Sequence, residues 1–331
     1  MSRKVSSSTQ QPPAPGAPER RRFLRGLCGV GLLSALGAPP TRLLAQSGSG
    51  SLSAVSLRDG LVLIRGAGGN VVVLDTPDGL VLVDSGAPAS AADLGRFLAE
   101  RYPRSPVEVL FNTHWHLEHT GGNDEIGAMG ATIVAHENTR LWMSTEFYVD
   151  WQDRTYPPRA DAALPTRTFF SSDPQPIELD VGGRRVVYGH LKQAHTDGDI
   201  YVHFPQLNVI AAGGAVTAGE FPVPDYVTGG WIGGTIDATR KLIDMSDDDT
   251  LIVPQSGPPR SRSDLEAQAE MLSTIRERIE ELAVQGKSAA EMVEAGITRD
   301  YEDAWDGDPR LFIENVYEGL WWGNRLRGIV A

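Results

Sequence analysis

Short apolar runs separated by turn residues mark the start of the folded region. They occur at residues 61–65, 70–75 and 80–84, with Gly-rich or Pro-Asp-Gly segments between them. Apolar runs of this length that end at Gly, Pro or Asp are typical of β-strands joined by tight turns. The pattern therefore predicts a β meander at the beginning of the folded chain.

Apolar residues at helical spacing follow this region and are most frequent toward the C-terminal end. It first occurs at residues 89–101, ahead of an apolar run at 107–111. Further strands are expected at residues 131–134, 176–180, 184–188, 208–214 and 251–254. Further helices are expected at residues 136–143, 236–245, 264–284, 288–294 and 311–322, with Ser263 capping helix 264–284 and Gly286 ending it. Strands interleaved with helices and then followed by helices alone predict an α/β domain with a helical tail.

One segment, residues 147–165, shows neither periodicity. It carries the aromatic residues Tyr148, Trp151 and Tyr156 and the pair Pro157-Pro158. Long irregular connections of this kind often cover a pocket. A packed surface loop is an equally good interpretation, and both stay open.

The N-terminal end has the order of features found in targeting sequences. Polar residues 1–19 precede Arg20-Arg21-Arg22-Phe23-Leu24-Arg25, and an apolar segment at 26–38 follows, too short to anchor in a bilayer. This stretch resembles a twin-arginine export signal, with cleavage expected near Ala45. Residues 1–45 are therefore interpreted as a signal peptide, which implies a periplasmic or otherwise exported protein. The alternative is a disordered basic tail.

Composition narrows the possible partners. The chain has a net charge of −13, and residues 1–45 hold seven of its 30 Lys and Arg but one of its 43 Asp and Glu. An acidic mature chain disfavours nucleic acid as a partner. No later apolar stretch is long enough to span a membrane, so no stable anchor is expected after cleavage. The single cysteine, Cys28, lies in the leader, so the mature chain has neither a disulfide nor a thiolate ligand.

Three of the seven histidines gather in one short stretch. His114, His116 and His119, together with Glu118, follow the apolar run at 107–111 and precede the pair Gly121-Gly122. Turns at strand ends are common positions for functional sites. Imidazole nitrogen and carboxylate oxygen are ligands that suit zinc or iron. The stretch therefore predicts a metal site, with unrelated surface histidines as the alternative.

The same residues resemble a known family motif. His114-Trp115-His116-Leu117-Glu118-His119 is similar to the His-x-His-x-Asp-His motif of the metallo-β-lactamase-fold hydrolases, with Glu118 in the position of the family's Asp. The resemblance implies a four-layer αββα sandwich over residues 46–262, with residues 263–331 as a C-terminal helical extension packed on it. It also implies that Asp84, at a strand end, braces the metal loop, although a turn-forming aspartate explains the local sequence as well.

A second motif supports the first. Ala194-His195-Thr196-Asp197-Gly198-Asp199 resembles the family's His-Thr-x-Gly-Asp motif, which makes His195 the third imidazole beside His114 and His116. Asp199 is expected to brace this loop. The remaining histidines, His136, His190 and His203, are expected to be structural rather than ligands.

Two ligands of the complete family set are absent. The segment 208–214 aligns with a strand that ends Thr-Gly-Asp in relatives, and Gly214 stands at the Asp that bridges two metals. Segment 252–258 aligns with Val-Pro-Gly-His-Gly-Pro, and Ser256 stands at the histidine. One zinc ion is therefore expected, with a second ion weak or absent and iron as an alternative metal.

Two functions from different classes follow. In the first, zinc on His114, His116 and His195 holds a hydroxide that attacks an ester, amide or lactone of a small-molecule substrate. Glu118 acts there as the general base, or else Glu118 and His119 touch a metal themselves. In the second, the protein is a catalytically inactive relative that serves as a binding or metal-holding module. Hydrolysis of β-lactams does not follow from the fold.

Overall fold

The computed structural model describes the backbone of residues 51–326. All the described residues belong to one compact unit. The predicted export signal at residues 1–45 lies outside the described residues.

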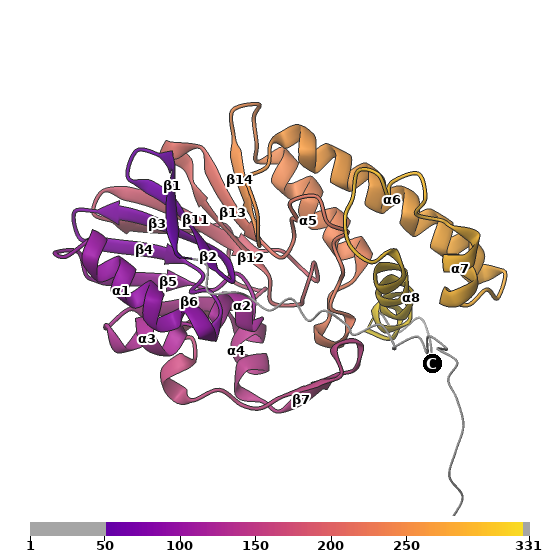
Figure 1. The fold of residues 1–331 in the computed structure, drawn as a ribbon, viewed down its shortest axis with the longest axis horizontal. Helices are drawn as coiled ribbons and strands as arrows, with labels where there is room; N and C mark the ends of the chain where they lie inside the picture. Colours follow the sequence, from indigo (N-terminus) through magenta and orange to yellow (C-terminus); the bar gives the residue numbers. More distant parts are fainter. Residues whose placement is uncertain (1–50, 327–331) are drawn as a thin grey trace, which may run out of the picture. The chain divides into compact units, whose positions relative to one another are not determined.

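A seven-stranded mixed sheet forms one half of the central sandwich (Figure 1). In sheet order its strands are β1 (Ser53–Arg58), β2 (Leu61–Ala67), β3 (Gly69–Thr76), β4 (Gly79–Val83), β5 (Val107–Phe111), β6 (Thr132–His136) and β9 (Arg167–Phe169). The first four pair antiparallel, so the predicted meander is confirmed. β4, β5, β6 and β9 pair in parallel. Parallel strands end at the same edge, so the loops after β4 and β5 meet there.

A five-stranded sheet forms the other half. Its strands are β10 (Ile177–Val181), β11 (Arg184–His190), β12 (Ile200–Phe204), β13 (Val209–Gly213) and β14 (Leu251–Pro254). The turn between β10 and β11 has Gly182 and Gly183 at φ 57° and 78°, a left-handed conformation that glycine adopts without strain. A backbone hydrogen bond from Ile200 N to Thr113 O, 2.8 Å long, joins β12 to the loop after β5.

Helices cover the outer face of each sheet and complete four layers. α1 (Ala91–Arg101) and α3 (Asn123–Ala128) place Leu94, Leu98 and Ile126 against the seven-stranded sheet. α5 (Ile232–Asp244) and α6 (Arg262–Val284) cover the five-stranded sheet with residues that include Leu242 and Leu265. A separate apolar core, which includes Phe111 and Val202, fills the space between the sheets. The predicted α/β sandwich is therefore confirmed, and Figure 1 shows α1 and α5 on opposite sides.

The C-terminal helices build a core of their own. α7 (Ala289–Ala295) and α8 (Pro309–Leu326) pack with α5 and α6 around buried side chains that include Trp231, Met271, Ile275 and Phe312. The ring of Phe312 stacks on Phe221 at a centroid distance of 5.0 Å. Backbone bonds from Phe221 N to Asp306 O and from Asp306 N to Gly219 O, 2.9 and 2.7 Å long, tie this region to the loop after β13.

The structure corrects two local predictions. The cap of α6 is Ser261 rather than Ser263, because the Ser261 hydroxyl accepts from Asp264 N while the Asp264 carboxylate accepts from Ser261 N. Segment 147–165 is also more regular than expected. It contains the hairpin strands β7 (Phe147–Val149) and β8 (Arg154–Tyr156). Both strands are too short for an alternating pattern to be recognised.

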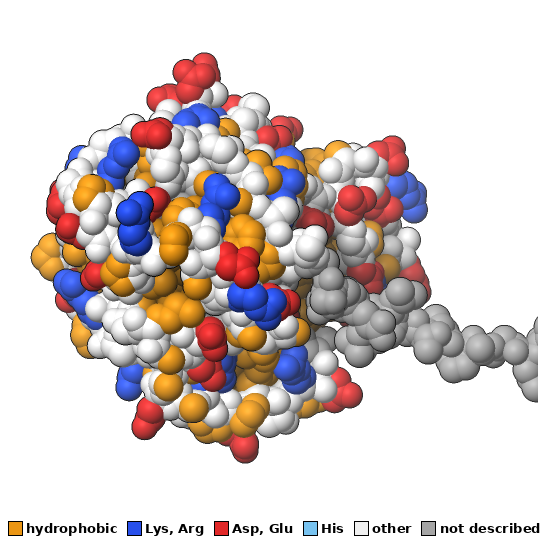
Figure 2. All heavy atoms as spheres, turned by 60° about the vertical axis from the view of Figure 1, so that its left-hand side comes forward, with side chains coloured by type: hydrophobic (Ala, Val, Ile, Leu, Met, Phe, Trp, Pro, Cys, Tyr) orange, Lys and Arg blue, Asp and Glu red, His pale blue; other side chains and the backbone are white. Residues whose placement is uncertain are grey.

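The remaining elements are short and lie mostly in loops. They are α2 (Leu117–Thr120), α4 (Glu137–Ser144) and the 3₁₀ turns η1 (Pro88–Ser90), η2 (Asp150–Gln152), η3 (Asp161–Ala163), η4 (Pro205–Leu207) and η5 (Tyr226–Thr228). None of the helices within the described residues is both long and apolar enough to cross a bilayer. On the face in Figure 2, acidic and basic side chains are interspersed with hydrophobic ones.

Candidate metal centre

Three histidines from two loops converge at the edge of the sandwich. His114 and His116 follow β5, and His195 lies in the loop between β11 and β12. Each offers one ring nitrogen, and these three atoms lie within 4.8 Å of one another. All three residues are buried, with exposed fractions of 0%, 9% and 8%. The structure thus brings together the three imidazoles that the two motifs predicted.

The orientation of the rings shows which nitrogen each histidine presents. His195 Nε2 lies 3.2 Å from His116 Nδ1. His114 Nε2 is buried without a hydrogen-bond partner among the described residues. A buried polar atom left unpaired costs free energy, so such an atom points to a missing ligand. Three converging imidazole nitrogens fit a zinc ion with an open fourth position.

The opposite nitrogen of each ring is held by a second partner. The partners are Thr113 Oγ1 for His114 Nδ1 at 3.0 Å, Asp225 Oδ2 for His116 Nε2 at 3.1 Å, and Val223 O for His195 Nδ1 at 2.9 Å. The Val223 carbonyl can only accept, so His195 carries its proton on Nδ1 and leaves Nε2 free. Outer contacts of this kind fix the tautomer and orientation of metal-binding histidines.

Asp225 is the functional candidate that the sequence did not reveal. It is fully buried, and Oδ2 accepts from Thr228 Oγ1 at 2.6 Å while Oδ1 accepts from Trp151 Nε1 at 3.2 Å. Burial alone would raise the pKa of Asp225, but the hydrogen bonds from His116 and Thr228 hold it below its ordinary value. The available signal was a single Asp after Pro222 and Pro224, and it belongs to neither of the two histidine motifs.

Asp84 links His119 to the loop that carries His114. Its carboxylate accepts from Thr113 N at 2.7 Å and from Thr113 Oγ1 at 2.8 Å, and His119 Nδ1 lies 2.8 Å away. Asp84 has φ 62°, a strained conformation for a residue with a side chain. These are the contacts expected of a bracing residue, while that role itself stays a prediction. The ring of His119 lies 4.4 Å from that of His114.

Burial keeps the imidazoles of His114 and His195 neutral. It is the main cause that lowers the pKa of His114 and of His195, and neighbouring histidines lower both further. Neutral imidazole is the form that binds a metal. The other predicted bracing residue, Asp199, accepts from Thr196 N at 2.7 Å and from Thr196 Oγ1 at 3.1 Å, and burial raises its pKa.

A cavity of about 440 Å³ opens beside the cluster. His116, His119, His195 and Glu118 line it, and Glu118 is exposed. Ser256, which stands where the complete family set has its last histidine, lines the cavity as well. A Cβ added at Gly214 would lie 2.5 Å from His195 Cδ2, so this position has no room for the bridging aspartate.

The β7–β8 hairpin combines both interpretations of segment 147–165. Its Phe147 and Tyr156 rings pack against Trp115, at 4.9 and 4.7 Å. Trp151, at the tip, lines the cavity. Tyr226 OH donates to Asp150 Oδ1 at 2.6 Å and ties the tip to η5. The segment is therefore a packed loop that also forms one wall of the site.

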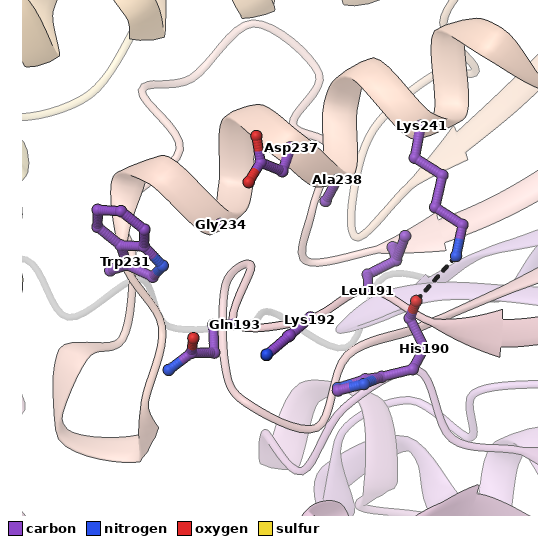
Figure 3. Close-up of a pocket in the computed structure, with 9 residues that line it drawn as sticks. All are labelled: His190, Leu191, Lys192, Gln193, Trp231, Gly234, Asp237, Ala238 and Lys241. Carbon is purple, nitrogen blue, oxygen red and sulfur yellow. Dashed lines mark hydrogen bonds between the residues drawn. The ribbon is translucent and has the colours of Figure 1, made fainter. Parts of the chain in front are cut away.

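The other histidines lie outside the cluster. His136 and His190 stack with ring centroids 3.9 Å apart, and Ser171 Oγ bridges them at 3.0 and 3.1 Å. His203 lies on β12 and belongs to neither group. His190 also lines a second cavity of about 560 Å³ between α5 and residues 191–193, where Lys241 Nζ donates to the His190 carbonyl (Figure 3).

Comparison with known sequences identifies the family of this arrangement. The family model described as the metallo-beta-lactamase superfamily matches residues 64–284. The 2,4-dinitroanisole O-demethylase subunit alpha of Nocardioides sp. (strain JS1661) is 27% identical over 187 residues, which cover 56% of this chain and 51% of that protein. The chain thus spans about half the length of this curated relative.

Solved structures share the fold at low sequence identity. The metallo-beta-lactamase from Pontibacter korlensis has a TM-score of 0.50 at 20% identity, over 67% of this chain and 93% of that one. The inverting sec-alkylsulfatase Pisa1 from Pseudomonas sp. has a TM-score of 0.60 at 16% identity, over 83% of this chain and 51% of that one. Such identities establish the fold and leave the substrate open.

Proposed function

We propose that this chain, which belongs to the metallo-beta-lactamase superfamily, is a single-metal hydrolase of esters, amides or lactones. The supporting observation is the convergence of His114 Nε2, His116 Nδ1 and His195 Nε2 beside an open cavity. Zinc bound there would lower the pKa of a water ligand to about 7 and polarise the substrate carbonyl. The absent ligands at Gly214 and Ser256 support a single ion.

The chain's own residues supply the proton transfer. The Glu118 carboxylate lines the cavity and is exposed, so it can take the proton from the attacking water. The acyl–oxygen or acyl–nitrogen bond then breaks, and Glu118 returns the proton to the leaving alcohol or amine. Asp225 keeps the His116 ring in its binding orientation throughout.

Aryl methyl ethers are a second candidate substrate class. The curated relative is named as a 2,4-dinitroanisole O-demethylase subunit, and Trp151 and Phe221 give this cavity aromatic walls. Water and an aryl methyl ether would give a phenol and methanol, with the same proton transfer at Glu118. This reaction requires no oxidant.

The test is a panel of substrates run on matched variants. Phenyl esters, anilides, lactones, 2,4-dinitroanisole and a cephalosporin are incubated with zinc-loaded wild type, His116→Ala and Glu118→Gln. We expect Glu118→Gln to keep its zinc and lose about 10²–10⁴-fold in kcat, as is typical when a general base is removed. His116→Ala is expected to lose both zinc and activity.

The control for Glu118→Gln is Glu125→Gln on α3, an exposed glutamate outside the cavity. It removes the same charge and should leave kcat unchanged. Equal background rates for zinc-loaded wild type and His116→Ala across the panel would overturn the hydrolase and favour the binding-module alternative.

Export is proposed on the sequence alone. Arg20 and Arg21 precede an apolar segment in the order that twin-arginine targeting requires. Replacement of both by Lys should leave unprocessed precursor in the cytoplasm, which fractionation followed by immunoblotting detects. Mature protein outside the cytoplasm in that variant would refute the proposal.

A further inference from the structure

We infer that the metal cavity selects electrically neutral or cationic aryl substrates over anionic ones, and that Glu220 determines this specificity. The inference rests on the proposed function and names the substrate class for it. Three independent features carry it: the charges that line the cavity, the way in which Glu220 is held, and the aromatic walls.

The charged side chains around the cavity are all of one sign. Glu118 and Glu220 line it, and none of the described lining residues is Lys or Arg. Asp225 adds a buried carboxylate behind His116. The second cavity differs, because Lys192 and Lys241 line it (Figure 3). Clefts lined by charges of one sign concentrate opposite charges and repel like ones, with effects of about 10–10³-fold on association rates.

Glu220 is exposed, and its own loop and the C-terminal region restrain it. Its Oε2 accepts from Ala218 N at 3.0 Å. The backbone on either side, at Gly219 and Phe221, is bonded to Asp306. The charge therefore has a defined place in the cavity wall. A nearby cation, Arg154, stacks over the Tyr156 ring at 4.6 Å and is not one of the lining residues.

The aromatic walls are also restrained by contacts. Phe221 stacks on Phe312, and the indole Nε1 of Trp151 donates to Asp225. Both lining rings are therefore restrained, and an aryl group can pack against them. A cationic group gains further stabilisation from an aromatic face and from the carboxylates. Anionic substrates such as sulfate esters and carboxylate-bearing β-lactams meet repulsion instead.

The experiment uses three phenyl acetates that differ in charge. They carry a para methylsulfonyl, sulfonate or trimethylammonium group, and each rate is divided by the rate of hydroxide-catalysed hydrolysis. We expect zinc-loaded wild type to prefer the neutral and cationic esters to the sulfonate by at least about tenfold in kcat/KM at low ionic strength. Glu220→Gln should reduce this preference several-fold, and salt should reduce it in the wild type.

Two variants serve as controls. Glu294→Gln removes one exposed charge from α7, outside the lining residues, and Lys192→Gln changes the second cavity. Both should leave the charge preference unchanged. An equal response in Glu294→Gln would assign the preference to the net charge of the chain and overturn the role of Glu220.

A binding measurement separates this inference from the hydrolase proposal. Acetophenones with the same three para groups cannot be hydrolysed, and their binding to the zinc-loaded protein is followed by quenching of tryptophan fluorescence. One outcome is that no ester is turned over, while neutral and cationic ketones bind more tightly than the sulfonate and Glu220→Gln reduces this preference. That outcome would refute the hydrolase and keep the inference. Sulfonate binding that equals or exceeds neutral binding would overturn the inference whether or not esters are hydrolysed.

Discussion

The Oδ2 atom of Asp225 lies 3.1 Å from Nε2 of His116, on the side of the ring opposite to the nitrogen that faces the cluster. A carboxylate in this position raises the basicity of the imidazole and fixes its orientation toward a metal. The two residues are 109 positions apart in the chain. Tertiary structure alone creates the contact.

Asp225→Asn should weaken metal binding about 10–100-fold, the usual cost of removing an outer-shell partner. The amide keeps an oxygen that can accept from His116 but lacks the negative charge. Competition with a chelator measures the affinity. Asp150→Asn is the control, because Asp150 contacts Tyr226 in the same region without touching His116. Equal affinity in wild type and Asp225→Asn would contradict the assignment.

Gly214→Asp should fail to restore a second metal. The added Cβ would lie 2.5 Å from the His195 ring, so the substitution is expected to displace a ligand of the first ion. Elemental analysis should find close to one metal per chain in the wild type and in Ser256→His, and less than one in Gly214→Asp. A gain to two metals in Gly214→Asp would show that the loop adapts.

The His136–His190 pair should make folding sensitive to acid. Burial first, and His190 second, lower the pKa of His136 to about 3. In the unfolded chain His136 has a pKa near 6.5, so below that pH it binds a proton there that it does not bind in the folded chain. The free energy of unfolding therefore falls as the pH drops toward 3.

His136→Asn removes this dependence while keeping a residue that can cap α4. The wild-type advantage in free energy of unfolding should shrink by about 1 kcal/mol between pH 7.5 and 5.5. Urea unfolding at both values measures it. The clustered metal ligands titrate in both proteins, so their contribution largely cancels. A difference that is independent of pH would refute the prediction.

Tyr226→Phe should loosen the β7–β8 hairpin. It removes the hydrogen bond to Asp150, worth about tenfold in a local opening equilibrium. Hydrogen exchange should accelerate in residues 147–156 and stay unchanged in the central strands. Tyr148→Phe is the control, because it removes a hydrogen bond to Asp153 within the hairpin and leaves the bond between Tyr226 and Asp150 intact. Acceleration throughout the sandwich would indicate general destabilisation instead.

Local patterns predicted the parts of the fold that depend on local sequence. The strands Val107–Phe111 and Leu251–Pro254 have the predicted boundaries, because each is a buried apolar run that ends at polar or turn residues. The helix α6 was predicted with the wrong cap, because Ser261 and Ser263 are both good caps and only the position of Asp264 distinguishes them.

The candidate site also contains residues that local sequence predicts and residues that it does not. His114 and His116 are neighbours in sequence, and His195 lies in a recognisable motif, so these residues could be predicted. Asp225 could not, because its role depends on a loop that returns to His116 across the sandwich. Strands of three residues, such as β7 and β8, carry too little periodicity to be found.

Because Asp306 is bonded to the Gly219–Phe221 loop, metal binding and the shape of the cavity wall depend on different parts of the chain. The matched family region ends at residue 284, whereas the contacts that hold Glu220 and Phe221 in place come from Asp306 and Phe312 beyond it. The three donor atoms and the Glu220–Phe221 part of the cavity wall thus depend on different stretches of sequence. Chimaeras joined just after α6 would keep the three histidines and exchange the support of the wall.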